Sequence, residues 1–415
     1  MKSWRRDWLW LVWLTFACGP AYGWQLDTRL KLFGLETWLP QDDLQRAVEG
    51  SPAYDGSVDL RTMFREQIGG WQLIVDHTLL YQTGDTYAFD AAPEGRLDQT
   101  PRSDARRYVD MTWTLEDGAR HETQHRFDRL ALEYRTERWG VTAGRMAVSW
   151  GSGIVFQTID LFAPFAPTTV DRDYKNGEDL VLIDGLAGAG DWQLLAVLRR
   201  NDDEQRSGSV DSFGGKWHGT FGTTEYEVIA GRHYRDPIAG FSLRHALGGA
   251  LVRTDWLFTD VHDGGRAVSA LVNIDYSFEW FARNWYVFAE YFHNGFGSNQ
   301  QPIDASELPE ALSARLQRGE VFTIMRDYLA VGSQIEWHPL WTQTLTLIGN
   351  LHDQSSLLQT ELSHNLSDAQ QIEVGALTNF GDTGKEYGAI PLGALAPGYT
   401  AGGGTQLYLR WTYYW

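Results

Sequence analysis

Residues 267–278, AVSALVNIDYSF, alternate between apolar and polar side chains and thereby decide the fold class. Every second residue from Val268 to Phe278 is apolar, and the residues between them are polar, with Leu271 as the one exception. A period of two residues predicts a β-strand that has one apolar face and one polar face.

The predicted strands are long. The last ten residues, 406–415 (QLYLRWTYYW), alternate in the same way, and similar alternation occurs at residues 128–135, 225–234, 341–351 and 370–380. Strands of soluble proteins are usually about five or six residues long, whereas about ten residues are needed to cross a bilayer at a tilt. Aromatic residues gather near the ends of these segments, as in the aromatic belts of membrane proteins. The sequence therefore predicts an all-β fold, a transmembrane antiparallel β-barrel.

The composition excludes a disordered chain. Of the 415 residues, 13% are aromatic and 21% are charged, which is too much large apolar surface for disorder. Beyond the N-terminus, no run of about 18 apolar residues occurs, so no transmembrane helix is expected.

Residues 1–23 are predicted to be a secretory signal peptide. They combine a basic start at residues 2–6, about ten mostly apolar residues and a small-residue cleavage site at residues 21–23. Lipidation of Cys18 and a twin-arginine signal are the alternatives. Cleavage would leave residues 24–415 as a single barrel domain without cysteine. The formal net charge would change from −19 to −21, because three basic residues and one acidic residue are removed.

The lengths of the connections test the barrel independently. In outer-membrane barrels short turns face the periplasm and longer loops face outside. Counting back from Trp415, short inner turns are predicted near residues 367, 340, 281, 248, 220, 189, 138 and 68. The outer connections include residues 37–55, 83–125, 149–178, 295–324 and 381–403, with one expected helix at residues 306–318. The count predicts eighteen strands, with sixteen as the alternative, provided that residues 107–117 do not cross the membrane.

In this architecture the chain resembles the porins and related outer-membrane barrels of Gram-negative bacteria. The most specific element is the last strand, which ends Tyr413-Tyr414-Trp415. In those families a C-terminal aromatic residue, most often Phe, belongs to the signal read by the insertion machinery, so Tyr413 and Trp415 are the expected insertion signal. The resemblance implies localisation in the outer membrane. The expected partners are outer-membrane lipid and lipopolysaccharide, the insertion machinery and small hydrophilic solutes, with no nucleic acid.

The third outer loop, at residues 149–178, is the densest group of functional candidates. In porins the loop at this position commonly folds into the lumen and narrows the pore. Gly151 and Gly153 allow a tight backbone course, and Phe162 and Phe165 can attach the loop to the inner wall. The charged candidates for a pore constriction are Arg145, Asp160, Asp171, Arg172, Asp173, Lys175, Glu178 and Asp179. An alternative, compatible interpretation is a latch that braces the barrel through mutual salt bridges.

Residues 121–125 (HETQH) match the H-E-x-x-H pattern of zinc hydrolases. That chemistry needs a helix that places both imidazoles on one face, together with a third ligand. Gly118 precedes the motif and a strand pattern begins at Phe127, so we interpret the match as accidental. No metal site and no cofactor are expected.

The leading functional hypothesis is a channel for diffusion or export of small hydrophilic solutes or a polysaccharide. The polar faces of the predicted strands mix Ser, Thr, Asn, Gln, Asp and Glu, a composition that suits a water-filled lumen. The alternatives are an outer-membrane barrel enzyme, in particular a hydrolase, and a structural barrel with a closed lumen. Of these, the enzyme is not expected.

Overall fold

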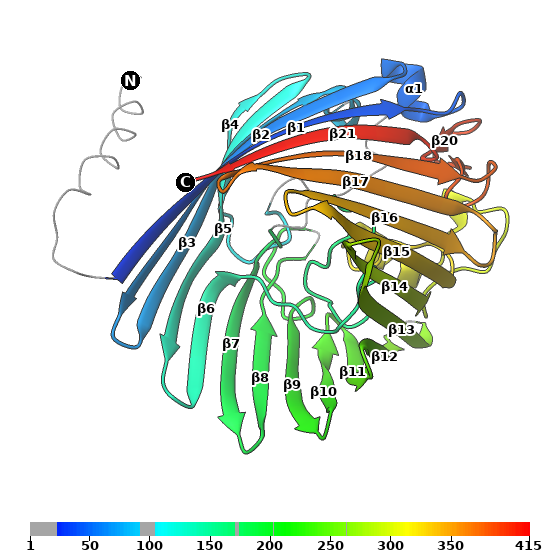
Figure 1. Ribbon diagram of the computed structural model, residues 1–415. Helices are drawn as coiled ribbons and strands as arrows, with labels where there is room; N and C mark the ends of the chain where they lie inside the picture. Colours follow the sequence, from blue (N-terminus) through cyan, green and yellow to red (C-terminus); the bar gives the residue numbers. More distant parts are fainter. Residues whose placement is uncertain (1–22, 92–103, 171–173, 202, 263) are drawn as a thin grey trace, which may run out of the picture.

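The chain forms a closed antiparallel β-barrel (Figure 1). The structure, a computed structural model, describes residues 23–91, 104–170, 174–201, 203–262 and 264–415. Within these residues 19 strands form one sheet, and eighteen of them pair in chain order into a ring. The fold class and the count of eighteen strands are confirmed, and the alternative of sixteen is wrong.

The ring strands are β1 (Gly23–Trp38), β2 (Ala53–Ile68), β3 (Trp71–Gly84), β5 (His121–Arg135), β6 (Trp139–Met146), β7 (Glu178–Ala187), β8 (Gly190–Val197), β9 (Ser212–Phe221), β10 (Thr224–His233), β11 (Asp236–Leu247), β12 (Ala250–Val261), β13 (Gly265–Trp280), β14 (Arg283–His293), β15 (Asp327–His338), β16 (Trp341–Asn350), β17 (Ser356–Ser367), β18 (Gln370–Phe380) and β21 (Thr405–Tyr414). Two short strands, β19 (Ile390–Pro391) and β20 (Thr400–Ala401), pair with each other in the last outer loop.

The strand β4 (Thr112–Asp117) belongs to the sheet but not to the ring. It pairs with the outer half of β5, whereas β6 pairs with the inner half of β5, from Leu130 to Arg135. Residues 107–117 therefore extend the wall beyond the outer end of β6 and do not cross the membrane, as predicted.

The ring closes where β1 pairs with β21. The register runs from Arg29 opposite Tyr414 to Trp38 opposite Thr405. At the inner end, the N–H of Thr28 donates to the carbonyl of Trp415 at 2.9 Å, and the N–H of Trp415 donates back at 3.0 Å. Closure pairs the two edges with each other, so neither exposes unpaired backbone groups to lipid.

The two faces of β13 confirm the predicted alternation. Val272, Ile274 and Tyr276 point outward and are 44–45% exposed, whereas Leu271 and Asn273 point into the barrel and are 0% and 1% exposed. Leu271, the apolar exception on the polar face, packs in an apolar cluster with Phe156 of the third outer loop. Its hydrophobic character is therefore explained by a contact inside the barrel.

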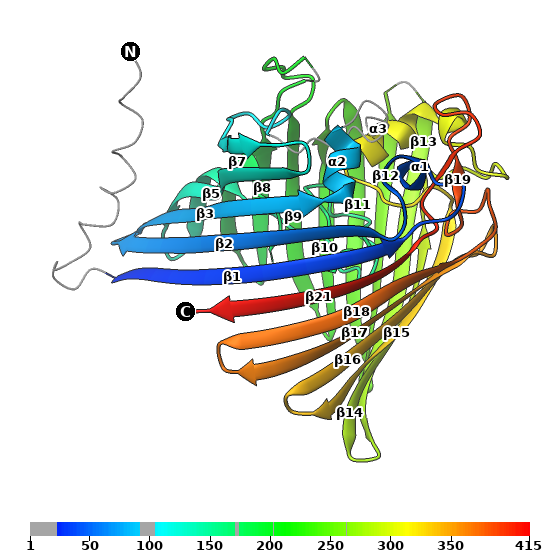
Figure 2. The same cartoon turned by 90° about the horizontal axis from the view of Figure 1, so that it is seen from above.

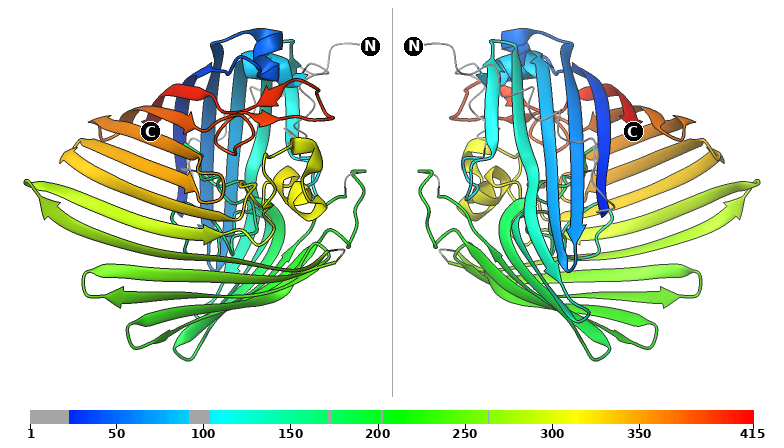
Figure 3. Two further views of the ribbon diagram at one scale, coloured as in Figure 1. Left: turned by 90° about the vertical axis from the view of Figure 1, so that its right-hand side faces the viewer. Right: turned by 90° about the vertical axis from the view of Figure 1, so that its left-hand side faces the viewer.

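The two ends of the barrel differ. The short turns carry exposed aromatic side chains such as Phe221 and Phe281, which are 82% and 81% exposed. Figures 2 and 3 show the helices α1 (Leu44–Glu49), α2 (Asp85–Ala91) and α3 (Glu310–Gln317) at the end with the long connections. Helix α3 lies within the predicted 306–318 segment, whereas α1 and α2 were not predicted.

Within the described residues, no helix has the length and apolar character required to cross a membrane.

Deleting Tyr413, Tyr414 and Trp415 should prevent assembly of the barrel. The deletion removes the reciprocal hydrogen bonds to Thr28 and the last pairs of the β1–β21 seam. The intact protein should migrate as a compact species in unboiled detergent gels and shift on boiling, because a closed barrel has no free edge from which to unfold. The truncated protein should lack this species and be depleted from the outer-membrane fraction.

Tyr414→Ser is the matched control, because it keeps the seam backbone and both outward rings of the predicted insertion signal. This variant should assemble normally. Normal amounts of heat-modifiable truncated protein in the outer membrane would contradict the role given to the last strand.

Candidate functional site

The described parts of the third outer loop, residues 147–170 and 174–177, lie inside the ring of strands, where the loop is drawn in teal in Figure 1. The carboxylate of Glu290 on β14 accepts hydrogen bonds from three consecutive loop N–H groups, those of residues 154–156, at 2.7, 2.9 and 2.7 Å. The side chain of Asn273 donates to the same carboxylate at 2.9 Å. Glu290 has no exposed surface, so four donors compensate the burial of its carboxylate.

A second carboxylate, that of Asp255 on β12, holds the preceding turn. Ser152 donates its N–H to Asp255 at 2.7 Å and its hydroxyl at 2.6 Å. Gly151 has a φ of +88°, and a Cβ atom on Gly153 would lie 1.7 Å from the carbonyl oxygen of Phe156. Both positions therefore require glycine, in agreement with the tight course predicted for this segment.

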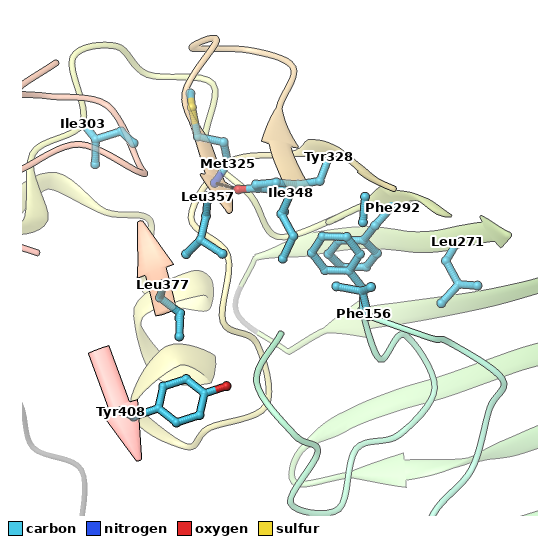
Figure 4. Close-up of a cluster of buried hydrophobic side chains, with 12 residues drawn as sticks. Phe156, Leu271, Phe292, Ile303, Met325, Tyr328, Ile348, Leu357, Leu377 and Tyr408 are labelled. Atoms are coloured by element: carbon cyan, nitrogen blue, oxygen red, sulfur yellow. Dashed lines mark hydrogen bonds between the residues drawn. The ribbon is translucent and has the colours of Figure 1, made fainter. Parts of the chain in front are cut away.

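Aromatic contacts complete the attachment of the loop to the wall. Phe156 stacks on Phe292 of β14, with ring centroids 4.7 Å apart, and lies 5.6 Å from the ring of Tyr328 (Figure 4). Farther along the loop, Phe162 packs edge-on against His233 of β10, with ring centroids 5.8 Å apart. The loop is thus fixed by both charged and apolar contacts.

Two of the predicted constriction residues, Asp160 and Lys175, pair with each other inside the loop. The ammonium of Lys175 also donates to the carbonyl oxygen of Val148 at 2.6 Å and to the hydroxyl of Ser149 at 2.9 Å. Burial raises the pKa of Asp160, although the neighbouring ammonium acts in the opposite direction. Lys175 thereby joins the end of the loop to its beginning and to its middle.

Two further candidates, Arg145 and Asp179, are cross-strand neighbours on β6 and β7. Arg145 has no exposed surface and binds two carboxylates, that of Asp179 at 2.8 Å and that of Asp104 at 2.6 Å. Burial opposes ionisation of Asp104, but Arg107 and Arg145 outweigh it and lower the pKa of this carboxyl. The pair therefore attaches the segment before β4 to the top of the wall.

The remaining candidates are placed differently. The carboxylate of Glu178 lies 3.7 Å from the guanidinium group of Arg199. Glu178 also lines a second outer cavity of about 390 Å³. Asp171, Arg172 and Asp173 lie outside the described residues. A constriction role for the whole set stays a prediction. Of the expected insertion signal, Tyr413 and Trp415 stack on each other at 5.1 Å.

Tyr174, which the sequence analysis did not single out, ties the end of the loop to the opposite wall. Its ring lies between the guanidinium groups of Arg61 and Arg129, at 3.5 and 4.5 Å from the ring centroid. Its hydroxyl donates to Asp76 and accepts from Arg129. Burial and the Asp76 charge raise the pKa of Tyr174. The only sequence signal for this residue is an aromatic ring within a charged run.

The loop segment 167–170 separates two cavities of the lumen. Thr168 lines an outer cavity of about 750 Å³, and its neighbours in the segment line an inner cavity of about 370 Å³. Strands β17, β18 and β21 contribute side chains to both cavities. Arg410 of β21 pairs with Glu373 and donates to the carbonyl oxygen of Val170 at 3.4 Å. The segment therefore lies between the outer and the inner cavity along this wall.

The H-E-x-x-H segment lies in the strand β5 rather than in a helix. His121 and His125 share one face, and Glu122 lies on the other. Four strand residues separate the two imidazoles by about 13 Å. The ring of His121 lies 3.2 Å from Glu116, and that of His125 lies 3.2 Å from His77. Within the described residues, no group of three or more His, Cys, Asp or Glu side chains is placed to hold a metal ion.

Arg145→Leu should lower the free energy of unfolding by about 3–5 kcal/mol, because it leaves the buried carboxylate of Asp179 without its cation and removes one of the two cations that contact Asp104. The free energy is measured by urea titration of the refolded protein in detergent micelles.

Arg135→Leu is the matched control. Arg135 also contacts two carboxylates, those of Glu133 and Asp184, but its side chain is 54% exposed. Loss of the Arg135 side chain should lower the free energy of unfolding by less than about 1 kcal/mol. Equal effects of the two substitutions would contradict the bracing role of Arg145.

Replacing His121 and His125 together with Ala should change neither the bound zinc nor any hydrolytic activity. The extended backbone of β5 keeps the imidazoles too far apart to share an ion. Metal analysis of the purified parent and variant checks this. Stoichiometric zinc in the parent that is lost in the variant would instead favour a metalloenzyme.

The comparisons with known proteins concern the fold. No protein-family model matches the chain, and a comparison with curated proteins gives no match. Among solved structures, a BenF-like porin from Pseudomonas fluorescens Pf-5 is similar with a TM-score of 0.53 and 11% identity, over 94% of this chain and 98% of that one. The outer membrane protein OpdK from Pseudomonas aeruginosa is similar with a TM-score of 0.52 and 10% identity, over the same shares. OccAB3 from Acinetobacter baumannii has a TM-score of 0.51 and 10% identity, over 95% and 99%. The chain therefore has the fold of these Gram-negative outer-membrane porins.

Proposed function

We propose that the protein is an outer-membrane channel through which small hydrophilic solutes pass, and that the third outer loop sets the width of the passage. The observation that carries the proposal is the attachment of this loop inside the barrel by Glu290 and Asp255. A loop held on the inner wall narrows the lumen without filling it, because cavities remain on both sides of the segment 167–170.

The lining of the inner cavity supports passage of polar solutes. Most of its wall side chains are hydroxyls, amides or charged groups, among them Ser333, Gln334, Thr344, Gln359 and Arg410. Arg410 and Glu373 place opposite charges beside the loop segment, and charges of both signs at a narrow point select and orient solutes. In this proposal the pore-constriction role predicted from the sequence is kept for four residues: Asp171, Arg172, Asp173 and Glu178. Arg145, Asp160, Lys175 and Asp179 act mainly as braces that keep the loop and the adjoining wall in place.

The same proposal includes the route to the membrane. Residues 1–23 act as a cleaved signal peptide. The outward-facing rings of Tyr413 and Trp415 contribute to recognition by the insertion machinery, and outer-membrane lipid and lipopolysaccharide surround the apolar outer face. We infer no hydrolytic activity, because residues 121–125 lie on a strand that splits the motif between two faces.

Glu290→Ala should release the loop and raise single-channel conductance. The substitution removes the acceptor of three loop N–H groups, and each hydrogen bond to a charged partner is worth about 1.5–3 kcal/mol. Conductance is measured in planar bilayers with the purified protein. Asp368→Ala, which removes a carboxylate from an exposed inner turn, is the matched control and should leave conductance unchanged.

Absence of any channel in the parent and in Glu290→Ala alike would contradict a transport function. A channel whose conductance is the same in both proteins would contradict the role of the loop in setting its width.

A further inference from the structure

The outer cavity has the size of a small-molecule site. Its volume of about 750 Å³ lies within the roughly 300–1,000 Å³ that is typical of ligand pockets. Its walls come from β1, β2, β3, β17, β18 and β21, and α1, α2 and the last outer loop border it at the mouth of the barrel. A solute entering from outside meets this cavity before the segment 167–170.

One side of the cavity is apolar. Phe33 and Leu35 of β1 face Leu357 of β17 and Leu377 of β18, all on the inner face of the barrel. Four further apolar side chains near the mouth extend this side: Leu39, Leu44, Phe89 and Leu392. A passage for purely hydrophilic solutes gains nothing from such a surface, whereas a solute with an apolar group would be desolvated by it.

The polar side of the cavity is acidic. Asp43, Asp55 and Asp90 line it, and none of the described lining residues is basic. The second outer cavity differs, because five arginines and only three carboxylates line it: Arg106, Arg107, Arg126, Arg199 and Arg318, with Asp104, Glu178 and Glu320. The excess of negative charge is therefore local to the larger cavity.

The carboxylates are oriented by the backbone around them. Asp55 accepts from the N–H and the hydroxyl of Thr86 at 2.9 and 2.7 Å. Asp43 accepts from the N–H of Arg46 at 3.2 Å and also from the N–H groups of Gln45 and Gly402. An ionised carboxylate can accept about four hydrogen bonds, so each retains capacity for a further donor. Thr400 also lines the cavity and is only 5% exposed, yet its hydroxyl oxygen makes no hydrogen bond within the described residues.

We propose that the outer cavity is a binding subsite for a small amphipathic cation, an amine joined to an aromatic or alkyl group. The apolar group lies against Phe33, Leu357 and Leu377, and the ammonium donates to Asp43 and Asp55. This inference rests on the proposed channel function and names the class of solute that the outer cavity selects.

The experiment measures binding rather than transport, so that it is independent of conductance. Phenethylamine, 2-phenylethanol and 3-phenylpropanoate are titrated calorimetrically into the purified protein in detergent micelles, and titrations into empty micelles are subtracted. The three probes share a phenyl group and differ in charge. The amine should bind roughly tenfold more tightly than the alcohol, and the carboxylate should bind most weakly, because only the amine is attracted by the acidic side chains.

The double substitution Asp43→Asn and Asp55→Asn should lower the affinity for the amine to that of the alcohol and leave the alcohol unchanged. Asn keeps the Oδ1 atom that accepts from the N–H groups of Arg46 and Thr86, and it caps a helix as well as Asp does. Asp260→Asn is the matched control, because Asp260 and its partner Arg266 lie at the outer rim and are both largely exposed.

Equal affinities of the parent for amine and alcohol would overturn the inference even if the double variant failed to fold. An effect of Asp260→Asn as large as that of the double variant would also overturn it, because the preference would then reflect overall charge. If bilayers show no channel while the amine preference is present, the binding site stands and the channel function fails.

Discussion

Every backbone N–H and C=O group that faces lipid must find a partner within the protein, and the pairing of β1 with β21 is the contact through which the chain meets this requirement. Without it the sheet would end in two exposed edges. With it, the outer face of each strand is free to be apolar and the inner face is free to be polar. The alternation of β13 follows from a closed sheet that separates lipid from the lumen.

The closed wall creates a second requirement inside the barrel. Asp255 and Glu290 carry charges on the inner face, and neither has exposed surface. Buried carboxylates are costly unless donors reach them. The N–H groups of residues 152 and 154–156 supply these donors, so the wall and the third outer loop depend on each other. Tyr174 and Lys175 tie down the far end of the same loop.

The strands and their lipid-facing side could be predicted from the sequence, because contact with lipid requires apolar residues at alternate positions within each single strand. The alternation around Val272 predicted the outer face correctly, and the short turns predicted the strand count. Contacts inside the barrel could not be predicted, since they join distant segments. Leu271 and Phe156 are 115 positions apart in the sequence, and nothing near either residue indicates the other. The helices α1 and α2 are only six and seven residues long, too short for a clear period.

The sequence pointed to the third outer loop but could not give the partners of its charged side chains. Asp160 and Lys175 were named as constriction candidates, with mutual salt bridges as the alternative, and the two side chains contact each other. Arg145 was selected for its charge, and its partner Asp104 comes from a different connection. The charges that hold the loop, on Glu290 and Asp255, lie within strands whose pattern resembles that of any polar inner face. Their role depends on which loop meets them.

The same contacts impose an order on the assembly of the barrel. The loop precedes its anchor Asp255 by 103 positions in the sequence, and it precedes Glu290 by 134 to 136. Contacts between such distant segments form slowly, because a long stretch of chain must be ordered first. The loop cannot dock until β12 to β14 stand in the wall. The width of the passage is therefore established only once this part of the wall is in place.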